Sequence, residues 1–219
     1  MSRMIGVLGG SFDPPHIGHL RPALEVRQAL GLEKVILMPA GRHPFKSESN
    51  RATPEQRLEM TRIATQNCVG LSVSDLEVRE RSTAYTVNTL AKLSRQFPDV
   101  ELVFLMGTDL LEELHLWKSW QRLLSIAHLA IMTRPGFQWE RLKGQAVEFL
   151  NQRRIADSSV LRCSTSGQYA CCLVPVTPLS ISSSALRSEL GTGGDGCWLI
   201  PDPVRDYIST HDLYVETDR

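Results

Sequence analysis

Residues 4–19 read MIGVLGGSFDPPHIGH, and this stretch sets the fold class of the 219-residue chain. The apolar run 4–8 predicts a buried strand, which ends in a turn at Gly9 and Gly10. A helix predicted over 19–30 follows it and is closed by Gly31. A strand, a glycine turn and a helix start in this order favour a site for an anionic group, because glycine lets the backbone approach closely and helix N-termini attract phosphate.

Strands and helices alternate beyond this stretch. Short apolar runs predict further strands at 34–38, 71–74, 101–106, 127–132 and 171–174. Helices are predicted at 54–67, 86–97, directly after 107–109, at 182–190 and at 203–210. Thr53 to Gln56 form a capping box for one of them, and Asp202 is expected to cap the last. The order predicts an α/β fold: a Rossmann-like, doubly wound parallel sheet with helices on both faces, whose ligands bind at the carboxyl ends of strands.

Composition excludes several classes of protein. Hydrophobic residues make up 42% and charged residues 22% of the chain, as in globular domains. Lys+Arg and Asp+Glu are 24 each, so the basic excess of a general nucleic-acid binder is missing. We expect one domain over 1–219, with no membrane helix and no export signal. Five cysteines without a CxxC motif indicate free thiols in the cytoplasm.

Two histidines stand at the predicted helix start. His16 and His19 are three residues apart, so both can face one ligand. The alternatives are a capping or surface role for each histidine, or a metal site, for which no third ligand stands at a suggestive spacing.

A serine run follows the predicted last strand. Residues 181–187 read ISSSALR, and a serine before a helix can simply be its N-cap. Hydroxyls and free amides at a helix start can also hold a β- or γ-phosphate, with Arg187 adding a fork of donors.

Both segments resemble signatures of the nucleotidylyltransferase superfamily. Residues 9–19 fill every fixed position of G-G-[ST]-F-D-P-x-H-x-G-H, and 181–187 fit I-S-S-[ST]-x-[IL]-R. The resemblance implies a fold of the nucleotidylyltransferase type, with His16, His19 and Arg187 as catalytic residues acting on the phosphates of ATP. The implied ATP-binding residues are Gly9, Gly10, Ser11, Phe12, Gly107, Asp109, Arg134, Ile181, Ser182, Ser183 and Ser184.

Other segments are similar to bacterial nicotinate mononucleotide adenylyltransferases. They are PAGRHPFK at 39–46, AYTVNTL at 84–90, GTD at 107–109 with WKSW at 117–120, TRPG at 133–136 and the pattern of residues 199–214. The resemblance implies that Lys46, Thr86, Trp117 and Lys118 bind the mononucleotide, with Trp117 stacked on its pyridine ring. Taken alone, Trp117 or Trp120 could be core, Asp109 a helix cap and Lys46 a solvated loop residue.

The implied reaction joins ATP and nicotinate mononucleotide to give deamido-NAD and pyrophosphate. The attacking phosphate is already anionic, so no general base is needed, and Mg²⁺ would arrive with ATP. The helices from about residue 182 are expected to close the ATP site. Alternatives are adenylyl transfer to nicotinamide mononucleotide or to phosphopantetheine, and a regulator that binds nucleotide without turnover. Neither nucleic acid nor a membrane is expected as a partner, and the sequence carries no signal for the oligomeric state.

Overall fold

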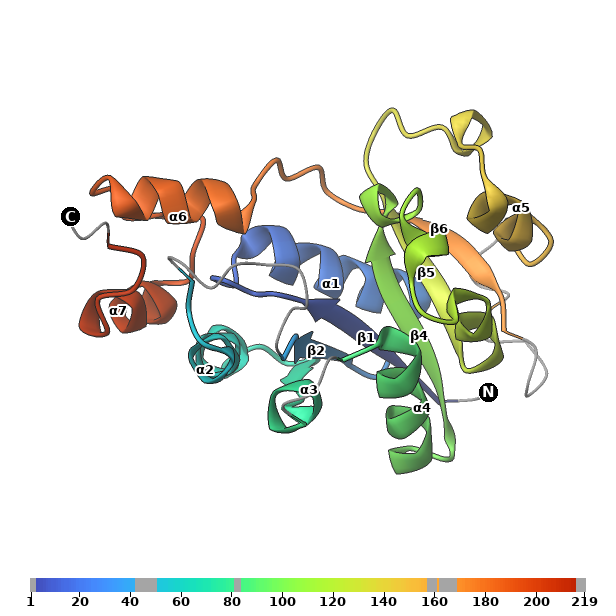
Figure 1. The fold of residues 1–219 in the computed structure, drawn as a ribbon, viewed down its shortest axis with the longest axis horizontal. Coiled ribbons are helices and arrows are strands. Elements are labelled where there is room, and N and C mark those ends of the chain that lie inside the picture. Colours follow the sequence, from blue (N-terminus) through green and yellow to red (C-terminus); the bar gives the residue numbers. More distant parts are fainter. Residues whose placement is uncertain (1–2, 42–50, 81–83, 157–160, 162–168, 216–219) are drawn as a thin grey trace. The chain divides into compact units, whose positions relative to one another are not determined.

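The computed structural model describes residues 3–41, 51–80, 84–156, 161 and 169–215. Its centre is a six-stranded sheet with the strand order β3-β2-β1-β4-β5-β6 (Figure 1). The strands are β1 (Arg3–Gly10), β2 (Val35–Pro39), β3 (Leu71–Val73), β4 (Val100–Gly107), β5 (Ala127–Thr133) and β6 (Cys171–Pro175). All six predicted strands are thus confirmed, with bounds shifted by one or two residues.

The pairings of β1 with β4, β4 with β5 and β5 with β6 are parallel. After β3 the chain crosses to the other side of β1, so the strand order switches between β1 and β4. Ligands of doubly wound sheets bind at the carboxyl ends of strands beside such a switch. The fold therefore directs attention to the residues that follow β1 and β4.

The chain forms two compact units. Unit 1 comprises Met1–Gly9, Pro22–Ile36 and Tyr85–Pro178, and unit 2 comprises Gly10–Arg21, Leu37–Ala84 and Leu179–Arg219. The helices are α1 (Ile17–Leu30), α2 (Pro54–Thr65), α3 (Leu76–Arg79), α4 (Thr86–Gln96), α5 (Gln145–Asn151), α6 (Ser183–Gly191) and α7 (Asp202–Thr210). The short helices α3 and α5 were not predicted from the sequence.

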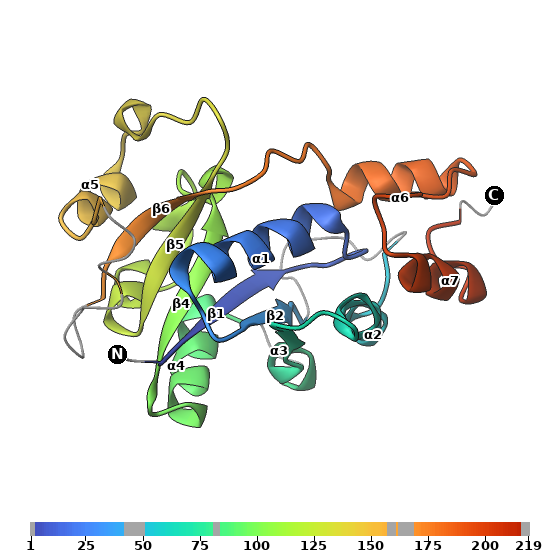
Figure 2. The same cartoon turned by 180° about the vertical axis from the view of Figure 1, so that it is seen from behind.

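Unit 1 is built on the central strands. Residues 102–106 of β4 are all buried, as expected for a strand covered on both faces. Figures 1 and 2 show α1 against one face of these strands and α4 against the other. The apolar residues of α4 that meet the sheet, Val87, Leu90 and Leu93, recur at helical spacing. The predicted covering of both faces is confirmed.

The helix predicted after residues 107–109 is present as 3₁₀ turns and not as one continuous helix. The chain instead forms three 3₁₀ helices, η1 (Thr108–Leu110), η2 (Leu114–Leu116) and η3 (Trp120–Ser125). The buried side chains of Leu111, Leu114, Trp120 and Leu123 are spaced in multiples of three. A period of three matches the three residues per turn of a 3₁₀ helix rather than the 3.6 of an α-helix. Another 3₁₀ helix, η4 (Trp139–Arg141), precedes α5.

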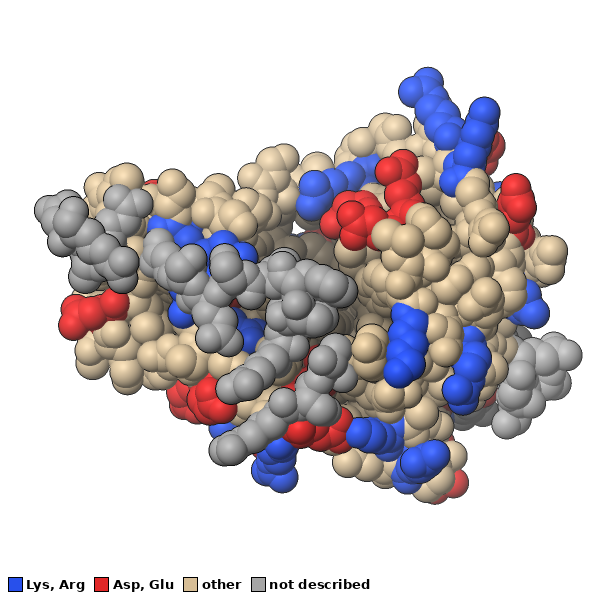
Figure 3. All heavy atoms as spheres, viewed as in Figure 1, with Lys and Arg blue, Asp and Glu red and all other residues tan. Residues whose placement is uncertain are grey.

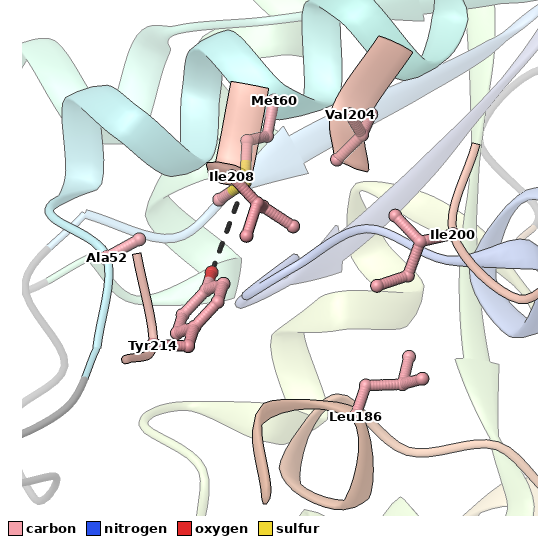
Figure 4. Close-up of a cluster of buried hydrophobic side chains, with 7 residues drawn as sticks. All are labelled: Ala52, Met60, Leu186, Ile200, Val204, Ile208 and Tyr214. Atoms are coloured by element: carbon pink, nitrogen blue, oxygen red, sulfur yellow. Dashed lines mark hydrogen bonds between the residues drawn. The ribbon is translucent and has the colours of Figure 1, made fainter. Parts of the chain in front are cut away.

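Unit 2 has its own apolar cluster. Its buried members are Ala52, Met60, Leu186, Ile200, Val204, Ile208 and Tyr214, drawn in Figure 4. They come from α2, α6, α7 and the segments that flank these helices. Tyr214 lies in the cluster with its ring buried, and its hydroxyl is 4.0 Å from the Met60 sulfur. The C-terminal segment is therefore part of the core of this unit.

The helix caps agree with the sequence in one case and differ in another. The Thr53 hydroxyl accepts from the Gln56 amide at 3.2 Å, and the Gln56 side chain accepts from the Thr53 amide at 2.9 Å. The predicted capping box is confirmed. The predicted cap at Asp202 is wrong, because α7 begins one residue earlier and Pro201 is its N-cap. The Asp202 carboxylate instead accepts from Arg205 at 2.9 Å.

None of the described helices is long and apolar enough to cross a membrane. The face of the molecule drawn in Figure 3 carries Lys and Arg side chains interspersed with Asp and Glu. The four described cysteines, Cys68, Cys171, Cys172 and Cys197, are free, as predicted. Burial raises the pKa of Cys171 and of Cys172 to about 12, so neither thiol is a nucleophile at neutral pH.

The capping box generates a prediction about stability. Thr53→Ala removes the acceptor for the Gln56 amide, so it should lower the free energy of unfolding by about 1 kcal/mol. Urea denaturation measures the change, and Ser188→Ala, at an exposed position inside α6, is the matched control and should lower stability by less than about 0.5 kcal/mol. An unchanged denaturation midpoint for Thr53→Ala would show that the box does not stabilise the fold.

Candidate active site

A buried arginine holds the segment after β1 in place. The Arg57 guanidinium on α2 donates to the carbonyl of Ser11 at 2.7 Å, and to those of Ala40 and Gly41 at 2.7 and 3.0 Å. The Ala40 amide also donates to the carbonyl of Gly10 at 2.9 Å. One side chain thus ties the turn after β1 to the turn after β2. Sequence reasoning missed Arg57, because its acceptors are backbone carbonyls that only the fold brings together.

The rings of His16 and His19 pack closely in a tilted arrangement. Their ring centroids are 3.8 Å apart and the ring planes are inclined by 33°. Phe12, which is fully buried with a φ of +48°, places the edge of its ring against His19 at 5.1 Å. The predicted convergence of the two histidines is confirmed, and His16 is buried whereas His19 is half-buried.

The hydrogen bonds of the two rings define which nitrogen carries the proton. His16 Nδ1 accepts from the Gly18 amide at 3.1 Å, and His19 Nδ1 accepts from the His16 amide at 3.4 Å. A neutral imidazole that accepts at Nδ1 carries its proton on Nε2. His16 Nε2 is buried without a hydrogen-bond partner among the described residues. A buried donor without a partner is rare and costly, so this atom is suited to meet a ligand.

Burial keeps both histidines neutral. It lowers the pKa of His16 to about 4 and that of His19 to about 3, and the neighbouring His16 lowers the latter further. At physiological pH the pair therefore offers two neutral N–H donors and no net charge. A neutral donor of this kind can bind a phosphate oxygen and is poorly suited to take up a proton.

The structure corrects the role expected for the helix N-terminus. The first amides of α1 are already used, because Ile17 donates to the Leu199 carbonyl at 2.9 Å and Gly18 donates to His16. His16 is thus a capping residue as well as the bearer of the free Nε2 donor. A Cβ at Gly18 would lie 2.9 Å from the His16 ring, so only glycine allows this close approach.

Arg187 reaches the same segment from α6. Its Nη1 donates to the carbonyl of Asp13 at 2.7 Å and lies 3.5 Å from the Asp13 carboxylate. Its Nη2 donates to the Ser184 hydroxyl at 3.3 Å. The structure therefore brings Arg187 to the motif that contains His16 and His19, as the sequence predicted.

The serine run begins α6 as expected, and both of its proposed roles remain compatible with the structure. Ser182 is the N-cap and accepts from the Ala185 amide at 3.2 Å. Ser183 donates to the carbonyl of Pro14 at 3.1 Å, and Ile181 packs against the apolar cluster of unit 2. The amides of the first helical turn have no acceptor within the helix, so they are suited to an anion.

Other predicted ATP-binding residues stand at strand ends. Gly9 and Gly10 end β1, Gly107 ends β4, and Asp109 lies exposed in η1 directly after it. The Asp109 carboxylate leaves no room for a Cβ at Gly107. Arg134 follows β5 and is exposed. Because β4 and β5 are parallel neighbours in register, Asp109 and Arg134 follow strands that end at the same edge of the sheet.

Of the predicted mononucleotide residues of unit 1, Thr86 and Lys118 lie at the start of α4. Thr86 is the first residue of this helix, and no acidic residue stands in its first turn. The Lys118 ammonium lies 4.2 Å from the ring centroid of Tyr85, the N-cap of α4. Trp117 is half-buried with its ring edge-on to Phe104. The cation and the helix N-terminus suit a carboxylate, and an aromatic side chain such as Trp117 suits a flat ring.

Two further expectations concern the core and Lys46. Trp120 is a core residue, packed edge-to-face on Phe149 at 5.2 Å. Lys46 lies outside the described residues. In the described part of the chain, no group of three or more His, Cys, Asp or Glu could hold a metal ion.

Comparison with known proteins agrees with this fold. Residues 7–189 match the family model described as cytidylyltransferase-like. The match covers most of the chain and agrees with the fold, so the protein is a member of the cytidylyltransferase-like class of nucleotide-transferring proteins.

Curated relatives narrow the class. A protein of Aeromonas salmonicida named "Probable nicotinate-nucleotide adenylyltransferase" is 40% identical over 210 residues, which is 96% of each chain. One of the same name from Acidithiobacillus ferrooxidans is 41% identical over 95% of this chain and 94% of its own. The nicotinic acid mononucleotide adenylyltransferase of Plasmodium falciparum, solved with NaAD, shares the fold with a TM-score of 0.72, at 20% identity and 97% coverage of both chains. The chain belongs to the nicotinate-nucleotide adenylyltransferase family.

The neutral histidine pair generates a prediction about pH. Each folded-state pKa lies below the ordinary value of 6.5, so the unfolded chain binds more protons between pH 6.5 and about 4. The free energy of unfolding should therefore fall as the pH drops below 6.5, and His16→Gln should make this fall less steep. An NMR titration of the imidazoles tests the cause, and a midpoint near 6.5 for either His16 or His19 would contradict it.

Proposed function

We propose that this protein transfers the AMP group of ATP to nicotinate mononucleotide, giving deamido-NAD and pyrophosphate. The observation that carries the proposal is the closely packed pair His16 and His19, with the buried Nε2 of His16 unbonded among the described residues, in a chain of this family. Their Nε2–H groups are proposed to bind the α-phosphoryl oxygens of ATP. These donors stabilise the charge that develops in the transition state.

The transfer itself is a displacement at phosphorus. A phosphate oxygen of the mononucleotide attacks the α-phosphorus of ATP, a new P–O bond forms, and the bond to the bridging oxygen of the β-phosphate breaks. Pyrophosphate leaves with that electron pair. The attacking oxygen is already anionic, so no residue has to remove a proton, which agrees with histidines whose pKa values burial lowers. Catalysis then depends on positioning and charge stabilisation.

Arg187 and the start of α6 are proposed to hold the leaving pyrophosphate. The guanidinium keeps N–H groups beyond the two that bond Asp13 and Ser184. Gly9, Gly10, Ser11 and Phe12 are proposed to shape the turn that admits the phosphates. In unit 1, Gly107, Asp109 and Arg134 are proposed to bind the adenosine part of ATP.

Nicotinate is favoured over nicotinamide by the charges near α4. The proposed pocket in unit 1 contains Trp117 for the ring, and the Thr86 end of α4 with Lys118 for the carboxylate. The positive end of a helix and an ammonium both stabilise a carboxylate, and they gain less from a neutral amide. Lys46 is proposed to contact the mononucleotide phosphate, as the resemblance implies.

Mg²⁺ is proposed to enter with ATP, held by phosphate oxygens and water. The described residues form no cluster fit for a resident metal. The Asp13 carboxylate, which forms an ion pair with Arg187, accepts hydrogen bonds from Ala52 and Tyr214 and faces guanidinium groups, so it is not placed as a metal ligand. We also propose that the enzyme acts in the cytoplasm, which the free thiols support.

The function is tested by offering ATP and Mg²⁺ with nicotinate mononucleotide, nicotinamide mononucleotide or phosphopantetheine, and measuring pyrophosphate release. We expect strong turnover with the nicotinate form alone. Chelation by EDTA should abolish turnover and leave the thermal unfolding midpoint unchanged, because the metal binds through ATP. Equal turnover with both pyridine nucleotides would overturn the specificity, and ATP binding without turnover on any of the three would indicate a regulator.

The role of the histidine pair is tested by substitution. His19→Ala should lower kcat by about 10²–10³, the scale of losing one preorganised donor. His115→Ala, at an exposed position in η2, is the matched control and should leave kcat within about twofold. A folded His19→Ala protein with near-normal kcat would exclude this histidine from the chemistry.

A further inference from the structure

A buried carboxylate lies within the proposed phosphate site. Asp13 is 1% exposed and stands three residues before His16. Its Oδ1 accepts from the Ala52 amide at 3.2 Å and from the Tyr214 hydroxyl at 2.8 Å. A carboxylate close to a polyphosphate repels it, and this repulsion weakens binding. A negative group here therefore needs a task that offsets the repulsion.

The second carboxylate oxygen points to that task. Asp13 Oδ2 is buried and has no hydrogen bond within the described residues. It lies 3.5 Å from Arg187 Nη1 and 3.6 Å from Arg51 Nη1. The backbone carbonyl of Asp13 accepts from the same Arg187 Nη1 at 2.7 Å. One residue thus holds the guanidinium through both its carbonyl and its charge.

Tyr214 holds Asp13 from the other end of the sequence. Its ring is buried in the apolar cluster of unit 2, next to Met60 and Ile208 (Figure 4). Burial, and then the Asp13 carboxylate, raise the pKa of Tyr214, so its hydroxyl stays protonated and donates. The carboxylate is thereby fixed by a group that is itself anchored in a core.

We propose that Asp13 is a positioning residue that fixes the Arg187 guanidinium for the leaving pyrophosphate, and that Tyr214 fixes Asp13 in turn. This inference rests on the proposed function, because it assigns Arg187 to the pyrophosphate. It makes the C-terminal segment part of the catalytic apparatus without contact to substrate. The negative charge of Asp13 is then tolerated in the proposed phosphate site because it orients the positive Arg187 guanidinium.

Asp13→Asn tests the charge at nearly constant shape. The amide oxygen can still accept from Ala52 and Tyr214, but the amide nitrogen would face Arg187 and Arg51. We expect kcat to fall about 10–100-fold, the scale of a misplaced catalytic group. The affinity for inorganic pyrophosphate, measured by calorimetry, should not weaken more than about threefold, because losing the negative charge favours anion binding. A role in structure alone does not predict this split between kcat and affinity.

Tyr214→Phe is the second variant and removes only the hydroxyl. We expect kcat to fall about three- to tenfold with the folded state retained in a thermal melt. Tyr207→Phe is the matched control on α7, and Asp195→Asn breaks an exposed ion pair with Arg205 in the same unit. Both controls should keep kcat within about twofold of the unsubstituted protein.

A double-mutant cycle decides whether the effect passes through Arg187. In an Arg187→Ala background, Asp13→Asn should lower kcat by less than about threefold, because the group that Asp13 positions is gone. The same 10–100-fold loss in both backgrounds would overturn the proposal. So would a kcat for Asp13→Asn within threefold of the unsubstituted protein.

The outcomes separate this inference from the proposed function. If the unsubstituted protein binds pyrophosphate and does not turn over any of the three substrates, the proposed function fails. The double-mutant cycle is then measured by pyrophosphate affinity instead of kcat. The change in affinity caused by Asp13→Asn is compared with and without Arg187. Asp13→Asn should tighten pyrophosphate binding at least about threefold more in the Arg187→Ala background than in the presence of Arg187. Equal changes in the two backgrounds would overturn the positioning role on its own.

Discussion

The hydrogen bond from the Gly18 amide to His16 Nδ1 is the interaction on which the site depends. It takes up a donor at the start of α1 and fixes the proton of the ring on Nε2. The helix-start amide is thus occupied, and the N–H available to a phosphate is the one at Nε2, on the other side of the imidazole ring. Burial adds to this, because it lowers the pKa of both histidines and keeps the pair uncharged. Two rings 3.8 Å apart would repel if both were protonated.

Two arginines of unit 2 lie beside Asp13, a buried carboxylate among the described residues of this unit. Arg51 and Arg187 both lie close to Asp13, whereas Arg57 spends its donors on backbone carbonyls. Arg57 and Arg187 have different roles. Arg57 stabilises the turns, and Arg187 keeps N–H groups for a ligand. The proposed polyphosphate site can thus be positive with its cations held in place, because the Arg57 and Arg187 guanidinium groups have fixed acceptors.

The proposed recognition of the pyridine ring depends on the charge near α4 and on the surface of an aromatic side chain. In unit 1 the start of α4 carries no acidic residue, and Lys118 lies over the Tyr85 ring beside it. A helix dipole and an ammonium read the charge of a carboxylate, and the Trp117 surface reads a flat ring. In the proposed function, discrimination between nicotinate and nicotinamide is a difference of charge, whereas the proposed transfer step depends on donors placed around phosphorus.

Much of this protein followed from local patterns in the sequence. The apolar runs predicted every strand, because a buried strand needs only a few consecutive apolar residues, and Thr53 with Gln56 predicted a cap whose bonds are all local. The motif around His16 and His19 indicated the family by resemblance. The 3₁₀ type of the helical turns after residue 107 was not predicted, since their burial period of three is visible only once the neighbours of Leu111, Leu114 and Leu123 are known. Tertiary structure alone decided the strand order, the three carbonyls that Arg57 binds, and the contact of Asp13 with Tyr214. Those contacts join residues far apart in the chain, such as the pair at positions 13 and 214. Local sequence propensity does not determine which distant group will donate a hydrogen bond to a buried carboxylate.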